Sequence, residues 1–349
     1  GEGMTPIVYV GPNKPTEKKW ANAMTEDGSM WVWIPRYAYS ITSGYHSSSA
    51  GTIEIKFLKD SSNVAYDGTS TWNNVSGQGK WNIHPAFNYG QEVSGIWVAK
   101  FEASPEGATT NAANSEYNGI DKKLQVKPGV SSWIGIEIGN IYTVCKNYNS
   151  KLNSHMMKND EWGAVAYLSK SKYGKENEEV WINNSAYITG AAGNSASAAT
   201  NVGMTTDYTS TQGVKASTTG TVYGVYDMNG GTWEYVAAYV NNGNANLTSY
   251  GNTLLNGDIK TKNVYSKASS DNYENNYNAN SSKYGDAVYE TSTIGISWYN
   301  DYSGFPYTIY PFFARGGYCN DGVVSGIFAH ICYTGNITNY SFRPVLIIL

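Results

Sequence analysis

The chain has 349 residues, so it can bury a substantial core without disulfide bonds. Its formal net charge is −4. Its only arginines are Arg36, Arg315 and Arg343, which argues against a protein that holds a nucleic-acid backbone. The longest apolar run, residues 345–349, is far too short to span a bilayer, so we expect no membrane insertion.

The amino-acid composition favours a binding protein. The chain contains 30 Tyr, 11 Trp and 37 Gly, and Tyr and Gly, with Ser and Asn, are residues that binding loops favour. Its three cysteines argue against a disulfide framework. Because the sequence opens with Gly-Glu-Gly, residues 1–28 are expected to be the end of an N-terminal linker or a truncated upstream part.

The first elements expected along the chain are strands. Residues 30–41 are rich in aromatic and β-branched residues and predict a strand that is broken near Pro35. Further strands are expected at residues 52–58 and 96–102, with a loop rich in Ser, Asn and Gly at residues 61–79.

Two helices are expected next. In residues 140–148, four residues fall on one helical face: Ile141, Val144, Cys145 and Tyr148. The second helix is expected at residues 161–170, with Asn159 and Asp160 as its N-cap.

The remaining chain is mostly small and polar. Residues 183–221 and 241–310 are interpreted as long loops, and loops of this length are often functional. Short strands are expected near Arg315 and from Phe342 onward. The sum is an α+β domain with two helices, short strands and long irregular loops.

Five segments, in order, resemble motifs of a known family. They are residues 29–39 (with M-W-V-W-I-P), 95–104 (G-I-W-V-A-K-F-E-A-S), 154–168 (S-H-M-M-K-N-D-E-W-G-A-V-A-Y-L), 224–235 (G-V-Y-D-M-N-G-G-T-W-E-Y), and 315–318 (R-G-G-Y) with 341–344 (S-F-R-P). The family is that of the formylglycine-generating enzyme, or sulfatase-modifying factor. The resemblance implies a single domain over residues 29–349 with an elaborated C-type-lectin fold and a long polar insertion at residues 241–310.

The same resemblance leaves two roles open for Glu234. In some relatives the corresponding loop helps to bind calcium, for which oxygen ligands are suited. Gly231 stands where the family usually has Asn, which departs from that pattern. Glu234 is therefore interpreted as a structural carboxylate or a calcium ligand, and no other cofactor is expected. Trp233 is expected to anchor the core, and Arg315 and Arg343 to fix loops through hydrogen bonds.

The family's enzymes oxidise a substrate cysteine with a pair of their own cysteines that lie close together after the R-G-G motif. Cys319 follows that motif here, but Cys332 lies thirteen positions further on. We therefore expect no enzyme and no catalytic residue, with a cysteine-oxidising enzyme as the alternative. A disulfide between the two cysteines is not deducible from sequence.

Residues 318–341 use a restricted set of amino acids, without Lys, Glu, Gln, Met or Trp. Every residue present can be encoded by a codon ending in C or T, as happens when the two adenines of asparagine codons are randomised. The segment resembles the variable region of diversity-generating-retroelement proteins, many of which carry a C-type-lectin fold. The residues expected to hold the scaffold are Gly316, Gly317, Gly322, Gly326, Phe328, Gly335, Phe342 and Arg343.

The resemblance implies a ligand-binding segment at residues 318–340 whose side chains reach solvent. The positions expected to vary and to bind ligand are Tyr318, Cys319, Asn320, Asp321, Val323, Val324, Ala329, His330, Ile331, Cys332, Tyr333, Thr334, Asn336, Ile337, Thr338, Asn339 and Tyr340. The expected partner is a protein or glycan on a cell surface, and the expected location is a phage tail or the cell exterior. A structural virion or surface component without a specific ligand is the remaining alternative.

Overall fold

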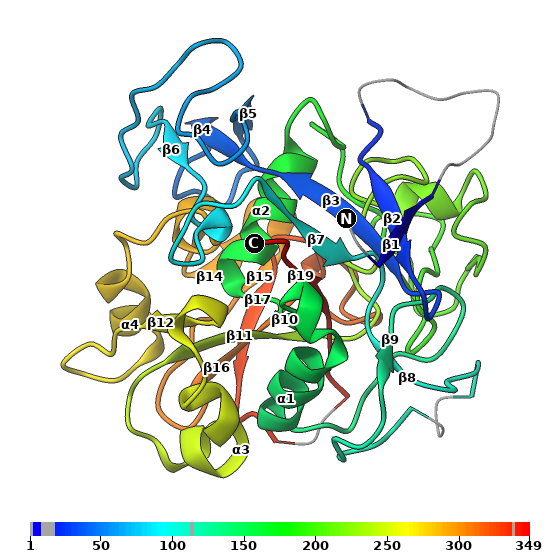
Figure 1. The fold of residues 1–349 in the computed structure, drawn as a ribbon. Coiled ribbons are helices and arrows are strands. Elements are labelled where there is room, and N and C mark those ends of the chain that lie inside the picture. Colours follow the sequence, from blue (N-terminus) through cyan, green and yellow to red (C-terminus); the bar gives the residue numbers. More distant parts are fainter. Residues whose placement is uncertain (1–2, 8–17, 112–114, 337–338) are drawn as a thin grey trace.

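A computed structural model of the chain describes residues 3–7, 18–111, 115–336 and 339–349. The fold is mixed α+β, as expected (Figure 1). The described residues form four α-helices: α1 (Ile138–Tyr148), α2 (Asn159–Lys170), α3 (Ala245–Leu255) and α4 (Tyr273–Ala279).

One sheet combines the two ends of the described chain. Its strand order is β1 (Met4–Pro6), β2 (Asn22–Thr25), β3 (Met30–Pro35), β7 (Gly95–Ala99), β19 (Pro344–Leu346) and β10 (His155–Met156). All neighbours in it are antiparallel. Since β19 lies between β7 and β10, the last strand of the chain occupies the interior of the sheet.

A second sheet includes β17, a strand that lies within the expected ligand-binding segment at residues 318–340. Its order is β12 (Asn263–Tyr265), β11 (Glu234–Val240), β16 (Phe312–Arg315), β17 (His330–Tyr333), β15 (Tyr302–Ser303), β14 (Gly295–Ser297) and β13 (Ser292–Thr293). A further strand, β18 (Ser341–Phe342), pairs in parallel with β11.

Two smaller sheets complete the strands. One has the order β5 (Thr52–Phe57), β4 (Tyr37–Ser43) and β6 (Asn82–Ile83), and the other pairs β8 (Ser104–Pro105) with β9 (Leu124–Gln125). The break expected near Pro35 is confirmed, because β3 and β4 belong to different sheets.

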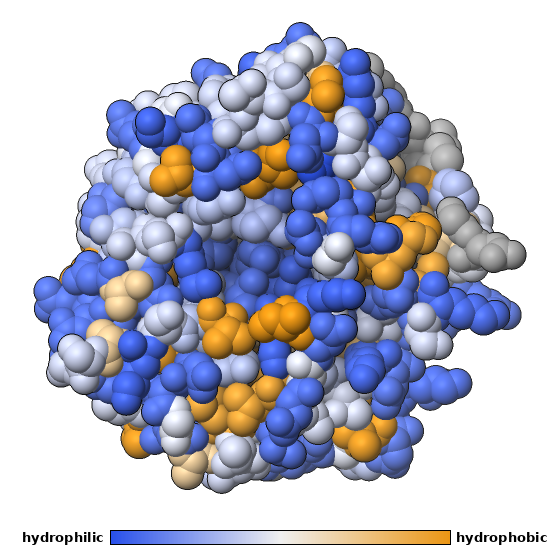
Figure 2. Space-filling model, turned by 60° about the vertical axis from the view of Figure 1, so that its left-hand side comes forward, coloured by the Kyte–Doolittle hydropathy of each residue, from blue (hydrophilic) through white to orange (hydrophobic). Residues whose placement is uncertain are grey.

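The surface is polar without being strongly charged. The face shown in Figure 2 is mostly hydrophilic, with a hollow at its centre and apolar residues in small separate groups. Charged residues make up only 15% of the chain, so neutral polar side chains supply much of this surface. None of the helices in the described ranges combines the length and apolar character needed to cross a membrane.

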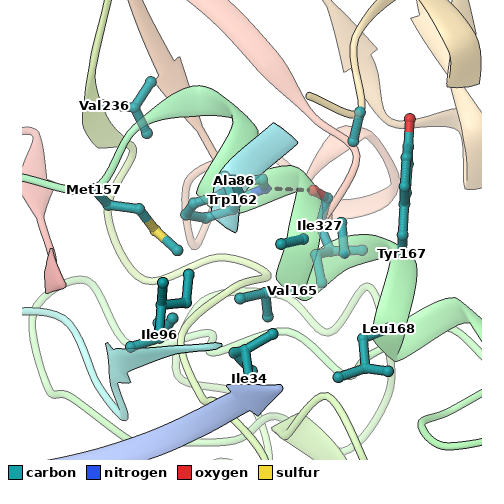
Figure 3. Close-up of a cluster of buried hydrophobic side chains, with 14 of the residues drawn as sticks. Ile34, Ala86, Ile96, Met157, Trp162, Val165, Tyr167, Leu168, Val236 and Ile327 are labelled. Carbon is teal, nitrogen blue, oxygen red and sulfur yellow. Dashed lines mark hydrogen bonds between the residues drawn. The ribbon is translucent and has the colours of Figure 1, made fainter. Parts of the chain in front are cut away.

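Helix α2 lies at the centre of the core. All of its residues are buried, and Trp162 and Val165 pack with Ile34 of β3 and Ile96 of β7 (Figure 3). The Trp162 indole Nε1 also donates a hydrogen bond to the carbonyl oxygen of Ile327, at 2.8 Å. The helix thus connects the first sheet to the segment that follows the R-G-G motif.

Both expected helices are confirmed, but the expected start of the second is wrong. The N-cap of α2 is Lys158, and Asn159 and Asp160 lie within its first turn. The Glu161 carboxylate accepts a hydrogen bond from the backbone N–H of Lys158 at 2.7 Å, as in a capping box. The helix therefore begins at Asn159, two residues before the expected start at Glu161.

The expectation of a structureless insertion at residues 241–310 is also wrong. This region contains α3, α4 and the strands from β12 to β15. Both helices begin with an asparagine N-cap, Asn244 and Asn272, whose side chain accepts a backbone N–H. The buried face of α3 includes only Leu247, Gly251 and Leu254. This is too few apolar residues at helical spacing to predict the helix from the sequence. By contrast, residues 183–221 do form long loops, with a short 3-10 helix at Gly213–Ala216.

Candidate functional site

The candidate binding segment, residues 318–340, is fixed to the second sheet at both ends. Strand β16, which precedes the segment, pairs antiparallel with β17, which lies within it. Arg315 stands opposite His330, and Phe312 stands opposite Tyr333. After it, Phe342 of β18 pairs with Tyr235 of β11. The segment therefore begins and ends at positions that the sheet determines.

Two glycines expected to hold the scaffold have a clear physical reason. Gly317 has a φ of +82°, and a Cβ there would lie 2.1 Å from the Ser325 hydroxyl oxygen. A Cβ at Gly326 would lie 2.2 Å from the Asp301 carboxylate. Any side chain at either position would require these neighbours to move.

The two phenylalanines expected to hold the scaffold are buried. Phe328 packs against Trp298 with 5.1 Å between ring centroids, and Phe342 packs against Trp133 at 5.8 Å. These aromatic contacts anchor the segment from within and immediately after it.

The expectation that the two arginines fix loops is confirmed. The Arg315 guanidinium is buried and donates hydrogen bonds to Asn159 Oδ1 at 2.6 Å and to the carbonyl oxygen of Asp286 at 2.8 Å. Arg343 is buried too and forms a bidentate pair with the Glu234 carboxylate, with 2.7 Å between Nε and Oε2. Both arginines therefore hold parts of the chain that are distant in sequence.

The surroundings of Glu234 do not fit a calcium ion. Both of its carboxylate oxygens accept hydrogen bonds from Arg343. The two other buried carboxylates nearby also have protein donors: Glu102 accepts from the Thr232 N–H, and Asp227 accepts from Asn183 Nδ2. Burial raises the pKa of Glu102 and of Asp227. A calcium ion would have to displace an arginine, so the geometry favours the structural interpretation of Glu234.

Many of the positions expected to vary do reach solvent. Val323, in a short 3-10 helix at Gly322–Val324, is 61% exposed. Four of these positions are exposed: Asn320, Val323, Val324 and Asn339. Eight are half-buried: Tyr318, Asp321, Ile331, Cys332, Tyr333, Thr334, Asn336 and Tyr340. Ile337 and Thr338 lie outside the described residues.

Three positions do not match the expectation of solvent exposure. Cys319, Ala329 and His330 are buried. The Cys319 N–H donates to the carbonyl oxygen of Gly231, Ala329 belongs to the core, and His330 Nε2 lies 3.1 Å from the Ser303 hydroxyl oxygen. Position in the segment thus did not predict burial: only His330 belongs to β17, whereas Ala329 stands immediately before that strand and Cys319 lies far from it in the sequence.

The structure adds tyrosines that the sequence did not assign to the site. Tyr333 and Tyr340 lie 5.1 Å apart between ring centroids, and Tyr340 lies 5.1 Å from Tyr235. On the other side, Tyr310 lies 6.4 Å from Tyr333 and 5.8 Å from Tyr307. We call these five residues the tyrosine cluster. Tyr307 and Tyr310 come from the polar insertion, and no spacing in the sequence links them to residues 318–340.

The two cysteines of the segment are free thiols. Burial raises the pKa of Cys332 to about 12, and burial also raises the pKa of Cys319. At neutral pH both are therefore protonated, whereas a nucleophilic or metal-binding cysteine acts as the thiolate.

No family model matches the sequence, and a search of curated proteins finds no match.

Proposed function

We propose that the protein is a non-catalytic ligand-binding protein that displays a diversified surface, as retroelement variable proteins do. Its scaffold would be the C-type-lectin fold of the formylglycine-generating-enzyme type. Its partner would be a protein or glycan on a cell surface, reached from a phage tail or from the outside of a cell. This proposal rests on the sequence resemblance, which is an analogy, and on one structural observation.

That observation is the division of labour within residues 318–340. Gly326 and Phe328, which have little room to change, belong to a continuous buried stretch at residues 325–330, and side chains that reach solvent at least in part lie on both sides of it. Exposed side chains can change with little effect on stability, typically within about 0.5 kcal/mol. A segment built in this way can present many surfaces on one backbone.

Sequencing the gene in sibling lineages tests the diversification. We expect differences to concentrate at the exposed and half-buried positions, while Gly317, Gly326 and Phe328 stay constant. The structure sharpens this expectation, because the buried residues Cys319 and Ala329 should vary only among small side chains. A near-copy of the 3′ coding end and a reverse-transcriptase gene should lie nearby. Differences spread evenly along the gene, or Lys, Glu and Trp appearing freely in the segment, would contradict the proposal.

Binding to intact bacterial cells tests the adhesion. The labelled protein should bind cells of at least one strain in a flow-cytometry panel, and Tyr333→Ser combined with Tyr340→Ser should reduce that binding at least tenfold. The matched control is Tyr187→Ser, an exposed tyrosine outside the cluster, which should leave cell binding unchanged. Equal binding by the double variant, with an unchanged melting temperature, would contradict the assignment.

The alternative of a cysteine-oxidising enzyme has less support. It requires a reactive thiolate, and burial keeps Cys319 and Cys332 protonated at neutral pH. The wide spacing between these two cysteines points the same way.

A further inference from the structure

A second surface feature is a groove that follows the outer edge of β5. Its volume is about 730 Å³, and β5 lines it along its whole length. One wall comes from residues 65–67 and Trp81, and the other from residues 170–173 with Glu176 and Asn177. The groove includes no residue of the segment 318–340.

Strand β5 is an edge strand, because its sheet has the order β5, β4, β6 (Figure 1). The Leu58 N–H donates to the carbonyl oxygen of Arg36 at 3.0 Å, which continues the antiparallel register with β4. Since bonding direction alternates along a strand, Glu54 and Lys56 direct their backbone groups toward β4. Ile53, Ile55 and Phe57 therefore direct theirs away from it, into the groove.

The outer edge already accepts one backbone hydrogen bond from this chain. The Tyr66 N–H donates to the carbonyl oxygen of Phe57 at 3.1 Å. In the part of the chain that the structure describes, no hydrogen bond reaches the outward N–H and C=O groups of Ile53 and Ile55. Two consecutive outward positions thus lack a backbone hydrogen bond, beside one that shows the edge can pair. Ile55 is half-buried, and Ile53 is 3% exposed.

The groove has a different chemistry on each side of the strand. On the core side, Phe57 packs against Tyr173 with 4.7 Å between ring centroids. On the other side, the Lys56 ammonium lies 3.0 Å from the Asp67 carboxylate and 4.8 Å from the centre of the Trp81 ring. An added strand would therefore meet an aromatic wall with alternate side chains and a charged wall with the others.

We propose that this groove binds an extended peptide segment of a partner protein, which adds to β5 as a fourth strand. The outward groups of Ile53 and Ile55 repeat at the spacing of a strand, and a polypeptide is the ligand class whose own N–H and C=O groups repeat at that spacing. The bound segment carries apolar side chains toward Phe57 and Tyr173 and polar or charged ones toward Lys56 and Asp67. A glycan has no such period, so the edge favours a peptide.

The test begins with a phage-displayed library of random linear peptides, selected against the full chain. Selected peptides should alternate apolar and polar residues, and fluorescence anisotropy gives their Kd. Ile55→Pro removes an outward N–H without removing a bond to β4, a place where proline is tolerated, and it should weaken binding at least tenfold. Ile55→Val keeps the backbone donor and should bind within about twofold of the parent chain.

Amide hydrogen exchange provides a readout that needs no substitution. The peptide should slow exchange at Ile53 and Ile55, while the amides of Glu54 and Lys56, which already face β4, change little. Unchanged exchange at Ile53 and Ile55, or peptides that bind Ile55→Pro equally well, would overturn the proposal. So would a selection that yields no peptide, or oligosaccharides that occupy the groove instead. Val323→Asp, in the candidate binding segment, should leave peptide binding intact, so this proposal and the proposed function can fail separately.

Discussion

Helix α2 and the segment 318–340 show two ways of fixing a chain. Every residue of α2 is buried, and its position depends on side chains such as Trp162. The segment 318–340 is fixed by its strand pairing and by a few glycines and phenylalanines, while most of its other side chains reach solvent at least in part. The comparison indicates that a few contacts can fix the backbone of a segment while most of its side chains are free to differ, which is what a variable surface requires.

The largest expected effect comes from breaking the scaffold at Arg343. Arg343→Met leaves the Glu234 carboxylate buried without its partner, and removing one member of a buried ion pair typically costs about 3–5 kcal/mol. Urea denaturation followed by circular dichroism measures the change. The double variant with Glu234→Gln should recover part of the loss, because no unpaired charge remains. A loss below about 1 kcal/mol for Arg343→Met would contradict this account of the scaffold.

An intermediate effect should appear as a pH dependence that comes from a buried carboxyl group outside the segment 318–340. Burial raises the pKa of Glu290 to about 7, and its Oε2 accepts hydrogen bonds from the hydroxyl groups of Tyr39 and Tyr167. The ordinary pKa of a glutamate side chain is 4.5, so the unfolded chain releases this proton at a lower pH than the folded protein. The contribution to stability is therefore full below about pH 4.5 and is lost as pH rises through about 7, by on the order of 3 kcal/mol.

Glu290→Gln should flatten this fall, measured as the free energy of unfolding at several pH values between 4 and 8. Asp321→Asn is the matched control in the segment 318–340, where the carboxyl group is half-buried, and it should change the profile much less. Parallel pH profiles for Glu290→Gln and the parent chain would show that Glu290 does not titrate in this way.

The smallest expected effect is at the exposed tip of the segment. Val323→Ser and Val324→Ser should change the free energy of unfolding by no more than about 0.5 kcal/mol, because both side chains are exposed. Ala329→Leu is the matched control, since it overfills a buried site in the same segment and should cost about 1–3 kcal/mol. Equal losses at Val323 and Ala329 would erase the distinction between exposed and buried positions of the segment.

Local patterns predicted part of this fold. The spacing of apolar residues predicted α1, and the break at Pro35 separated β3 from β4. The helices of residues 241–310 were missed because their buried faces are small, although the N-cap Asn244 was a usable signal. Periodicity reports burial only where enough apolar residues repeat.

The candidate site was predictable in its glycines and not in its side-chain directions. Gly317 and Gly326 stand where a Cβ does not fit. The burial of His330 depends on β15, and the contact of Tyr310 with Tyr333 depends on β16 pairing with β17. These contacts join distant parts of the chain, so no local pattern could reveal them.

Because β19 lies inside the first sheet, that sheet can form completely only if translation continues in frame to the end of β19. Residues 318–340 precede β18 and β19, and β19 lies between β7 and β10. A chain that stops or shifts frame inside the segment cannot supply this interior strand, and β7 and β10 then lose the strand that lies between them. The segment 318–340 is therefore translated before the strand that completes the sheet, and only a chain that continues in frame through the segment supplies that strand.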